Sequence, residues 1–212
     1  MAALTPRPLL ACALLTAFVL WALMFSPLTA PHLSFWPLMS LAAVVLAVFA
    51  ACCAPPWWRR LRFSPVDLAL GIGIAAGLWL VFLVGDCLSS ALFPFARPQV
   101  SAIYSIREGI SPWGLSLLLL VLIGPAEEYF WRGCVQEQLT RRRGANAGFL
   151  AATALYTAVH LPSCNVMLIM ASLVAGGAWG LCYRFFPERF TAIVISHALW
   201  DAAVFVWFPI QG

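Results

Sequence analysis

Seven apolar stretches, each close to the length of a membrane-spanning helix, constrain this chain more than any other feature of its sequence. Such a helix needs about 20 apolar residues, because the hydrocarbon core is roughly 30 Å thick and each residue rises about 1.5 Å. Only 9% of the residues are charged, against about 25% in soluble domains, which excludes a water-soluble fold. The sequence predicts an all-α, polytopic membrane helical bundle with about seven transmembrane helices, at residues 8–25, 35–54, 66–84, 113–134, 145–161, 166–185 and 190–208.

Two helix starts support this map. Ser64-Pro65 and Ser111-Pro112 each place a capping serine before a proline in the first helical turn, and both residue types favour a helix start. Between these points, residues 88–110 are too polar to cross a bilayer. Apolar side chains recur there at helical spacing and predict a short amphipathic helix in the membrane interface; they are Val100, Ile103 and Ile106.

The first apolar stretch has some features of a signal peptide, because Arg7 precedes an apolar run. The run is long, however, and the sequence Leu28-Thr29-Ala30 is a poor cleavage site. We therefore expect a retained transmembrane helix.

The arginines predict the orientation, since short cytoplasmic loops retain positive charge. All twelve basic residues are arginine. With the N-terminus in the cytoplasm, Arg97 and Arg107 lie outside, Arg132 lies in a span and nine arginines lie inside. These nine are Arg7, Arg59, Arg60, Arg62, Arg141, Arg142, Arg143, Arg184 and Arg189. We expect an external C-terminus, including Gly212, and a multi-pass protein of a bacterial inner membrane. The charges form small clusters rather than a basic face, so we expect no nucleic-acid partner.

Glycines within the predicted spans indicate close helix packing. Gly71, Gly73 and Gly77 superficially resemble a dinucleotide-binding loop, but they lie in an apolar span with no preceding strand. The spacing of Gly176 and Gly180 is also typical of closely packed membrane helices.

Ionisable side chains inside three of the spans mark the candidate functional site. Such residues are expensive in lipid and usually face a bundle interior or a water-filled cavity. They are Glu127, Glu128 and Arg132 in the fourth span, His160 in the fifth, and His197 and Asp201 in the seventh.

Helical spacing gives the two neighbouring acids different roles. Glu128 and Arg132 are four residues apart, share a helix face and are expected to pair. Glu127 is rotated by about 100° from that face, so it is left free to act as a base. We also expect the Gly124-Pro125 pair to kink the helix beside the site.

The other two polar helices show the same interval of four residues. Tyr156 and His160 share one face, and His197 and Asp201 share another. We expect Glu127, His160 and His197 to converge on one cavity that is open to water. Counted from the cytoplasmic end of each span at about 1.5 Å per residue, His160 lies deeper than Glu127 and His197. The three side chains can still meet if the fifth helix tilts or ends within the membrane near Pro162.

Three short motifs, in this order along the chain, resemble a known family. Residues 127–132 match E-E-x-x-x-R, residues 156–160 are similar to F-x-x-x-H, and residues 197–201 are similar to H-x-x-x-N. Together they resemble the CPBP family (CAAX protease and bacteriocin-processing, or Abi) of intramembrane glutamic proteases. We accordingly expect residues 1–112 to form N-terminal transmembrane helices with an outer amphipathic loop, and residues 113–212 to form the catalytic helical core.

The resemblance implies an endopeptidase, a hydrolase that cleaves within the membrane. It implies that Glu127 and His160 activate a water for attack on a peptide carbonyl, and that His197 and residue 201 stabilise the oxyanion. The geometry of the site would be held by Glu128 and Arg132, with Tyr156 beside them.

This chain departs from the family pattern at two positions. Tyr156 replaces phenylalanine and adds a hydroxyl group. Asp201 replaces asparagine, and an ionised aspartate cannot donate a hydrogen bond to an oxyanion. Asp201 is therefore either protonated or orients His197 instead, and we expect the orienting role.

Other interpretations of the same residues remain open. The polar pairs could serve only helix packing, or the protein could be a transporter or a noncatalytic membrane-binding protein, although its halves show no clear repeat. Glu127, His160 and His197 could also ligate zinc, although the chain lacks H-E-x-x-H. We expect no cofactor, with zinc as the alternative. The expected partners are the lipid bilayer and a membrane-associated protein or peptide, such as a C-terminal sorting signal or a bacteriocin-like substrate.

Overall fold

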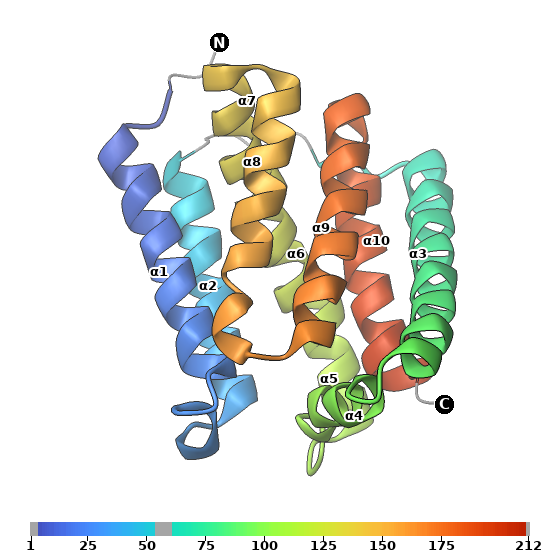
Figure 1. Ribbon diagram of the computed structural model, residues 1–212. Coiled ribbons are helices and arrows are strands. Elements are labelled where there is room, and N and C mark those ends of the chain that lie inside the picture. Colours follow the sequence, from blue (N-terminus) through green and yellow to red (C-terminus); the bar gives the residue numbers. More distant parts are fainter. Residues whose placement is uncertain (1–3, 54–60, 211–212) are drawn as a thin grey trace.

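The computed structural model describes residues 4–53 and 61–210, and within these ranges every regular element is a helix. The main helices run alongside one another and form a bundle (Figure 1). They are α1 (Arg7–Phe25), α2 (Phe35–Cys53), α3 (Pro65–Leu92), α4 (Ala96–Ser105), α5 (Pro112–Leu118), α6 (Gly124–Glu128), α7 (Glu137–Arg143), α8 (Ala145–Ala158), α9 (Val166–Phe185) and α10 (Phe190–Ala202). The prediction of an all-α membrane bundle is confirmed.

Six helices in the described part of the chain are long and apolar enough to cross a membrane, so this is a multi-pass membrane protein. The six are Arg7–Phe25, Phe35–Cys53, Pro65–Leu92, Pro112–Arg143, Val166–Phe185 and Pro187–Trp207. The span predicted at residues 145–161 corresponds to α8, which has 14 residues and also runs along the bundle, next to α9 (Figure 1). Predictions for Ala54, Arg59, Arg60 and Gly212 lie outside the described residues.

The structure refines two boundaries around the third span. Helix α3 continues to Leu92 instead of ending at residue 84, because its polar residues Asp86 and Ser89 face a cavity inside the bundle rather than lipid. The predicted amphipathic helix is present as α4, but Val100 and Ile103 also line this cavity.

Both predicted helix starts carry the expected caps. The Ser64 hydroxyl accepts a hydrogen bond from the Asp67 amide at 3.1 Å. The Ser111 hydroxyl accepts one from the Gly114 amide at 3.5 Å. These caps satisfy amide groups that have no partner within the first turn of a helix.

The arginines gather at the two ends of the bundle as the loop pattern predicts. Helix α1 starts at Arg7 and α7 ends at Arg143 at one end, where α9 also finishes (Figure 1). Arg97 lies in α4, at the opposite end of the bundle, and Arg107 follows that helix. The end of the bundle that holds Arg7 and Arg143 therefore carries most of the described arginines.

Helix α10 is the central element of the fold. Eleven of its 13 residues are buried, and it packs against α3, α6 and the π-helical turn Leu119–Ile123. A helix that is apolar and buried on nearly every side belongs to the core of a bundle. The polar residues of α10, His197 and Asp201, are therefore held inside the protein.

The glycine predictions are partly confirmed. A Cβ atom at Gly71, Gly176 or Gly180 would come within 3.1 Å of a side chain on a neighbouring helix, so these three glycines permit close packing. The prediction is wrong for Gly73 and Gly77, where a Cβ atom would meet nothing within 4 Å. Their face of α3 points away from the packed helices.

Two helix backbones come close together beside the polar residues at Gly124. A Cβ atom there would lie 2.7 Å from the Cα atom of Ala198 on α10. The neighbouring atoms belong to the backbone and cannot move aside as a flexible side chain would. Gly124 therefore sets the distance between α6 and α10.

We predict that Gly124→Ala lowers the free energy of unfolding by about 1 to 3 kcal/mol, the usual effect of overpacking a core. Gly73→Ala is the matched control, because its Cβ atom has free space and alanine favours a helix. Unfolding in detergent micelles, followed by circular dichroism, measures both changes. Equal destabilisation by the two variants would contradict the packing role of Gly124.

Candidate active site

The two neighbouring acids lie on a distorted part of their helix. Glu127 and Glu128 belong to α6, a short α-helical segment between two π-helical segments, Leu119–Ile123 and Tyr129–Gln136. Pro125 lies in the first turn of α6 and has no backbone N–H to donate. Departure from regular α-helical geometry occurs where the Gly124-Pro125 pair predicts it, and π-helical turns are frequent at functional sites.

Glu128 joins its own helix to α10. Its Oε1 atom accepts hydrogen bonds from Arg132 Nη1 at 2.8 Å and from His197 Nδ1 at 2.6 Å, and the side chain is fully buried. Arg132 Nη2 also donates to the carbonyl oxygen of Gly176 on α9, at 3.0 Å. The predicted ion pair between Glu128 and Arg132 is present, and it connects three helices.

The imidazole of His197 is also held by an aromatic side chain. Trp179 stacks on it with ring centres 3.8 Å apart and an interplanar angle of 15°, and its indole N–H donates to Ser196 Oγ at 2.9 Å. The Arg132 guanidinium lies over the Trp179 ring at 5.5 Å and over the Tyr156 ring at 5.0 Å. Trp179 was not predicted, because one tryptophan in an apolar helix gives no signal of its neighbours.

Asp201 lies beside His197, and Glu128 makes a shorter contact to the same ring. The Oδ2 atom of Asp201 is 3.5 Å from Nε2 of His197, whereas Glu128 makes the short hydrogen bond to Nδ1. The interval of four residues brings Asp201 near the ring along its own helix. The shorter contact comes from another helix, which the spacing could not show, and the orienting role of Asp201 stays a prediction.

Glu127 is buried, with 6% of its surface exposed. Its Oε2 atom accepts a hydrogen bond from the hydroxyl group of Tyr156 at 3.3 Å. That hydroxyl is the group by which Tyr156 differs from the phenylalanine of the family motif. The departure at position 156 thus adds a direct contact to the free carboxylate.

His160 lies in the turn that follows α8, because this helix ends at Ala158. An early end of the fifth helix is one of the two arrangements that the depth comparison allows. His160 Nδ1 donates to the backbone carbonyl of Tyr156 at 2.8 Å, and Nε2 accepts from the indole N–H of Trp21 at 3.2 Å. A carbonyl only accepts and an indole N–H only donates, so His160 is neutral with its proton on Nδ1.

Trp21 connects the first helix to the candidate site. It lies on α1, is 1% exposed and contacts the His160 ring edge-on, with ring centres 6.2 Å apart. The sequence gives no sign of this role, since Trp21 is one of several aromatic residues in an apolar span. The contact becomes visible only when α1 and the turn after α8 are placed together.

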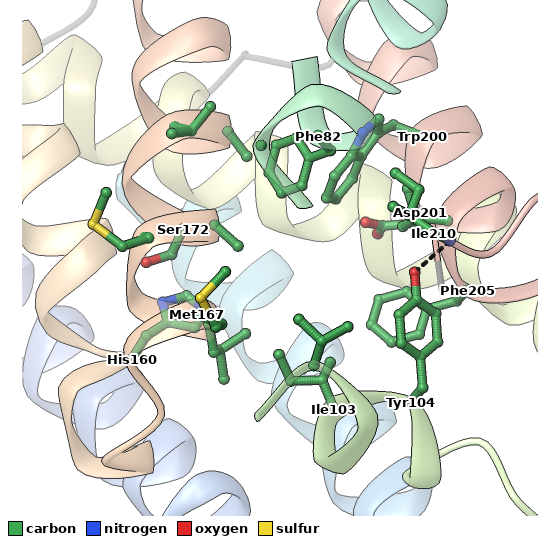
Figure 2. A pocket seen from close by; sticks show the side chains of 18 of the residues that line it. Phe82, Ile103, Tyr104, His160, Met167, Ser172, Trp200, Asp201, Phe205 and Ile210 are labelled. Carbon is green, nitrogen blue, oxygen red and sulfur yellow. Dashed lines mark hydrogen bonds between the residues drawn. The ribbon is translucent and has the colours of Figure 1, made fainter. Parts of the chain in front are cut away.

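Several predicted residues line one cavity of about 640 Å³. The cavity walls are mainly apolar, and Figure 2 shows His160, Ser172 and Asp201 among its lining side chains. The predicted site residues that line it are Glu127, Tyr156, His160, His197 and Asp201. Glu128 and Arg132 are not among the lining residues; Arg132 pairs with Glu128, which holds His197.

The cavity reaches the outer surface of the bundle between α3 and α9. Val81 on α3 and Met170 and Val174 on α9 line it and are also exposed. An apolar opening at this position faces the region that lipid would occupy.

The residues considered as zinc ligands do not form a compact group. Among residues 4–53 and 61–210, no three histidine, cysteine, aspartate or glutamate side chains are close enough together to hold a metal ion. Glu127, His160 and His197 share the cavity, but they do not meet at one point.

The helices that carry these residues match a known family. Residues 109–203 match the family described as type II CAAX prenyl endopeptidase Rce1-like. This part of the chain resembles the CPBP family. The match confirms the resemblance drawn from the three motifs and supports a CAAX-type intramembrane protease, a hydrolase that acts on a membrane-associated protein or peptide. No curated protein and no solved structure matches the chain.

We predict different consequences for the two acids. Glu128→Ala should lower the free energy of unfolding by about 3 to 5 kcal/mol, because it leaves Arg132 as an unpaired buried charge. Glu127→Ala removes one hydrogen bond and should have a much smaller effect, about 1 kcal/mol. Chemical denaturation in micelles measures both values, and equal losses would show that the two faces of the helix are not distinct.

We also predict that the Trp21 indole shields His160. In Trp21→Phe the N–H group is lost, so Nε2 should react several-fold faster with diethyl pyrocarbonate, as followed by mass spectrometry of the His160 peptide. Trp36→Phe is the matched control, because Trp36 also lines the cavity but donates to the carbonyl of Ile106 at 2.9 Å. If His160 reacts at the same rate in both variants, Trp21 does not protect Nε2.

Proposed function

We propose that this chain is an intramembrane endopeptidase in which Glu127 activates a water molecule for attack on a peptide bond. The observation that supports it most is that Glu127, His160 and His197, from three separate parts of the bundle, line one cavity. Ionisable residues in such a position are expensive, so a role in chemistry accounts for their presence.

Glu127 is the group that takes a proton from the water. One of its oxygens accepts from the Tyr156 hydroxyl, which fixes the carboxylate and leaves the second oxygen for the water. His160 carries a lone pair on Nε2, and a water molecule held between the two residues would replace the Trp21 N–H there. General-base catalysis of this kind requires only hydrogen-bond reach between carboxylate and water.

His197 is the group that stabilises the oxyanion. The Nδ1–H group of His197 donates a hydrogen bond to Glu128. A hydrogen bond from His197 to the oxyanion therefore requires a second proton, on Nε2. The imidazolium formed in this way lies between the carboxylates of Glu128 and Asp201. Asp201 therefore acts through its negative charge, which stabilises the imidazolium. The imidazolium in turn faces the negative charge that develops on the oxyanion, and this lowers the barrier.

The substrate is a segment of a membrane-associated protein or peptide, such as a C-terminal sorting signal or a bacteriocin-like peptide. The opening between α3 and α9 gives such a segment a route from the bilayer to Glu127. We place the arginine-rich end of the bundle in the cytoplasm of a cell with an inner membrane, following the rule that cytoplasmic loops retain positive charge. Residues 113–212 form the catalytic core, and residues 1–112 complete its cavity.

Glu127→Gln tests this proposal. In vesicles, the purified variant should lose at least roughly 100-fold in kcat for fluorescence-quenched membrane peptides of these two classes, because removal of a general base costs about 10²- to 10⁴-fold. Folding and abundance should be unchanged, since glutamine preserves the size of the side chain.

Glu137→Gln is the matched control. Glu137 lies further along the same transmembrane segment, where it pairs with Arg141 at 2.7 Å outside the cavity. Full activity of Glu127→Gln would contradict the proposed chemistry. Loss of abundance together with activity would instead favour a packing role for Glu127.

A further inference from the structure

A carboxylate that lies apart from the catalytic group lines the same cavity. Asp86 is on α3, outside the range of residues that matches the family. It is partly buried, and in the described part of the chain no hydrogen bond or ion pair engages its carboxylate. An ionisable residue in this position within a membrane helix points to a function.

The neighbours of Asp86 show how far it lies from the part of the cavity wall that holds Asp201. Phe82 lies one helical turn earlier on the same face of α3, and its ring packs against Trp200 with centres 4.7 Å apart. Trp200 directly precedes Asp201 in α10, and Figure 2 shows Phe82, Trp200 and Asp201 together on one side of the cavity. One turn of helix adds about 5 to 6 Å, so Asp86 lies roughly 10 Å from the Trp200 ring, which adjoins Asp201 in the cavity wall.

Asp86 also lies near α4, whose residue Tyr104 lines the same cavity. Burial raises the pKa of Tyr104 on this helix, and the negative charge of Asp86 acts in the same direction. The Tyr104 hydroxyl accepts a hydrogen bond from the Ile210 amide at 3.0 Å (Figure 2), which fixes it beside the cavity. Asp86 is thus close enough to α4 for its charge to act there, and both residues line the cavity.

The chemistry of this wall fits a cation. Phe82, Tyr104 and Phe205 provide aromatic surfaces around the cavity, which suit the methylene stem of a long basic side chain. Asp86 supplies the charge that would pair with its end. In a cavity with mainly apolar walls, such a pair is stronger than on a protein surface in water.

We propose that Asp86 binds a lysine or arginine side chain of the substrate, about three residues from the bond that is cleaved. The spacing follows from the distance of roughly 10 Å and a rise of about 3.3 Å per residue in an extended peptide. This proposal rests on the proposed protease function, and it names the chemistry of a substrate that the enzyme prefers.

Binding to an uncleaving enzyme tests the proposal without depending on catalysis. The protein is the Glu127→Gln variant in phosphatidylcholine vesicles, and the probes are three fluorescent membrane peptides that differ only by lysine, glutamine or glutamate at one position. Scanning this position along the peptide should show one place, near the third residue from the cleaved bond, where lysine binds roughly 10-fold or more tightly than glutamine.

Changing the charge of residue 86 should change this preference. In the Glu127→Gln protein, a second change Asp86→Asn should remove the tighter binding of the lysine peptide. The change Asp86→Lys should instead make the glutamate peptide bind most tightly. Ser89→Ala is the matched control, because Ser89 lies on the same face and also lines the cavity; it should keep the preference for lysine.

The outcomes separate this proposal from the protease function. Equal binding of the three peptides at every position would overturn the role of Asp86, as would an equal loss for all three in Asp86→Asn. Cleavage by the otherwise unchanged chain is measured separately with the same peptides. If the peptides bind with the expected charge preference but the otherwise unchanged chain does not cleave them, the result counts against the protease function and supports the role of Asp86.

Discussion

The structure depends on one buried oxygen atom, Oε1 of Glu128, which accepts hydrogen bonds from both Arg132 and His197. Apolar helices in lipid have little hydrophobic reason to associate in one particular way, so close packing and interhelical polar contacts decide their arrangement. This oxygen fixes α10 against the helix that carries the two acids, and Arg132 extends the same network to α9. The close approach of α6 and α10 at Gly124 makes this geometry possible.

The same network explains why two adjacent glutamates can have different roles. Glu128 is fully buried and its charge is compensated by Arg132 and His197. Glu127 faces the cavity, and within the described residues the Tyr156 hydroxyl is the one group that hydrogen-bonds to it. The proposed chemistry needs one acid that stays fixed and one that is free to exchange a proton. The rotation of about 100° between consecutive helical residues provides both from neighbouring positions.

Much of this arrangement could be predicted from the sequence, because it depends on local spacing. The apolar runs predict the helices, and the interval of four residues predicts the pairing of Glu128 with Arg132. The contacts of Trp21 and Trp179 could not be predicted, since they join helices far apart in the chain and apolar aromatic residues have no distinctive pattern. The same reason applies to His197, where the interval within α10 predicts the neighbouring Asp201 but not the shorter contact from Glu128 on another helix. Asp86 was overlooked because the third span was expected to end before it.

The most direct test of this account is a double-mutant cycle on the free energy of unfolding, with Glu128→Gln, His197→Phe and the combined variant, measured by chemical denaturation in micelles. If one oxygen of Glu128 holds His197 as the structure shows, the two changes should be coupled by about 1 to 3 kcal/mol, the range for residues in direct contact. Additive effects within about 0.5 kcal/mol would show that Glu128 does not hold His197, and would contradict the arrangement on which the proposed chemistry depends.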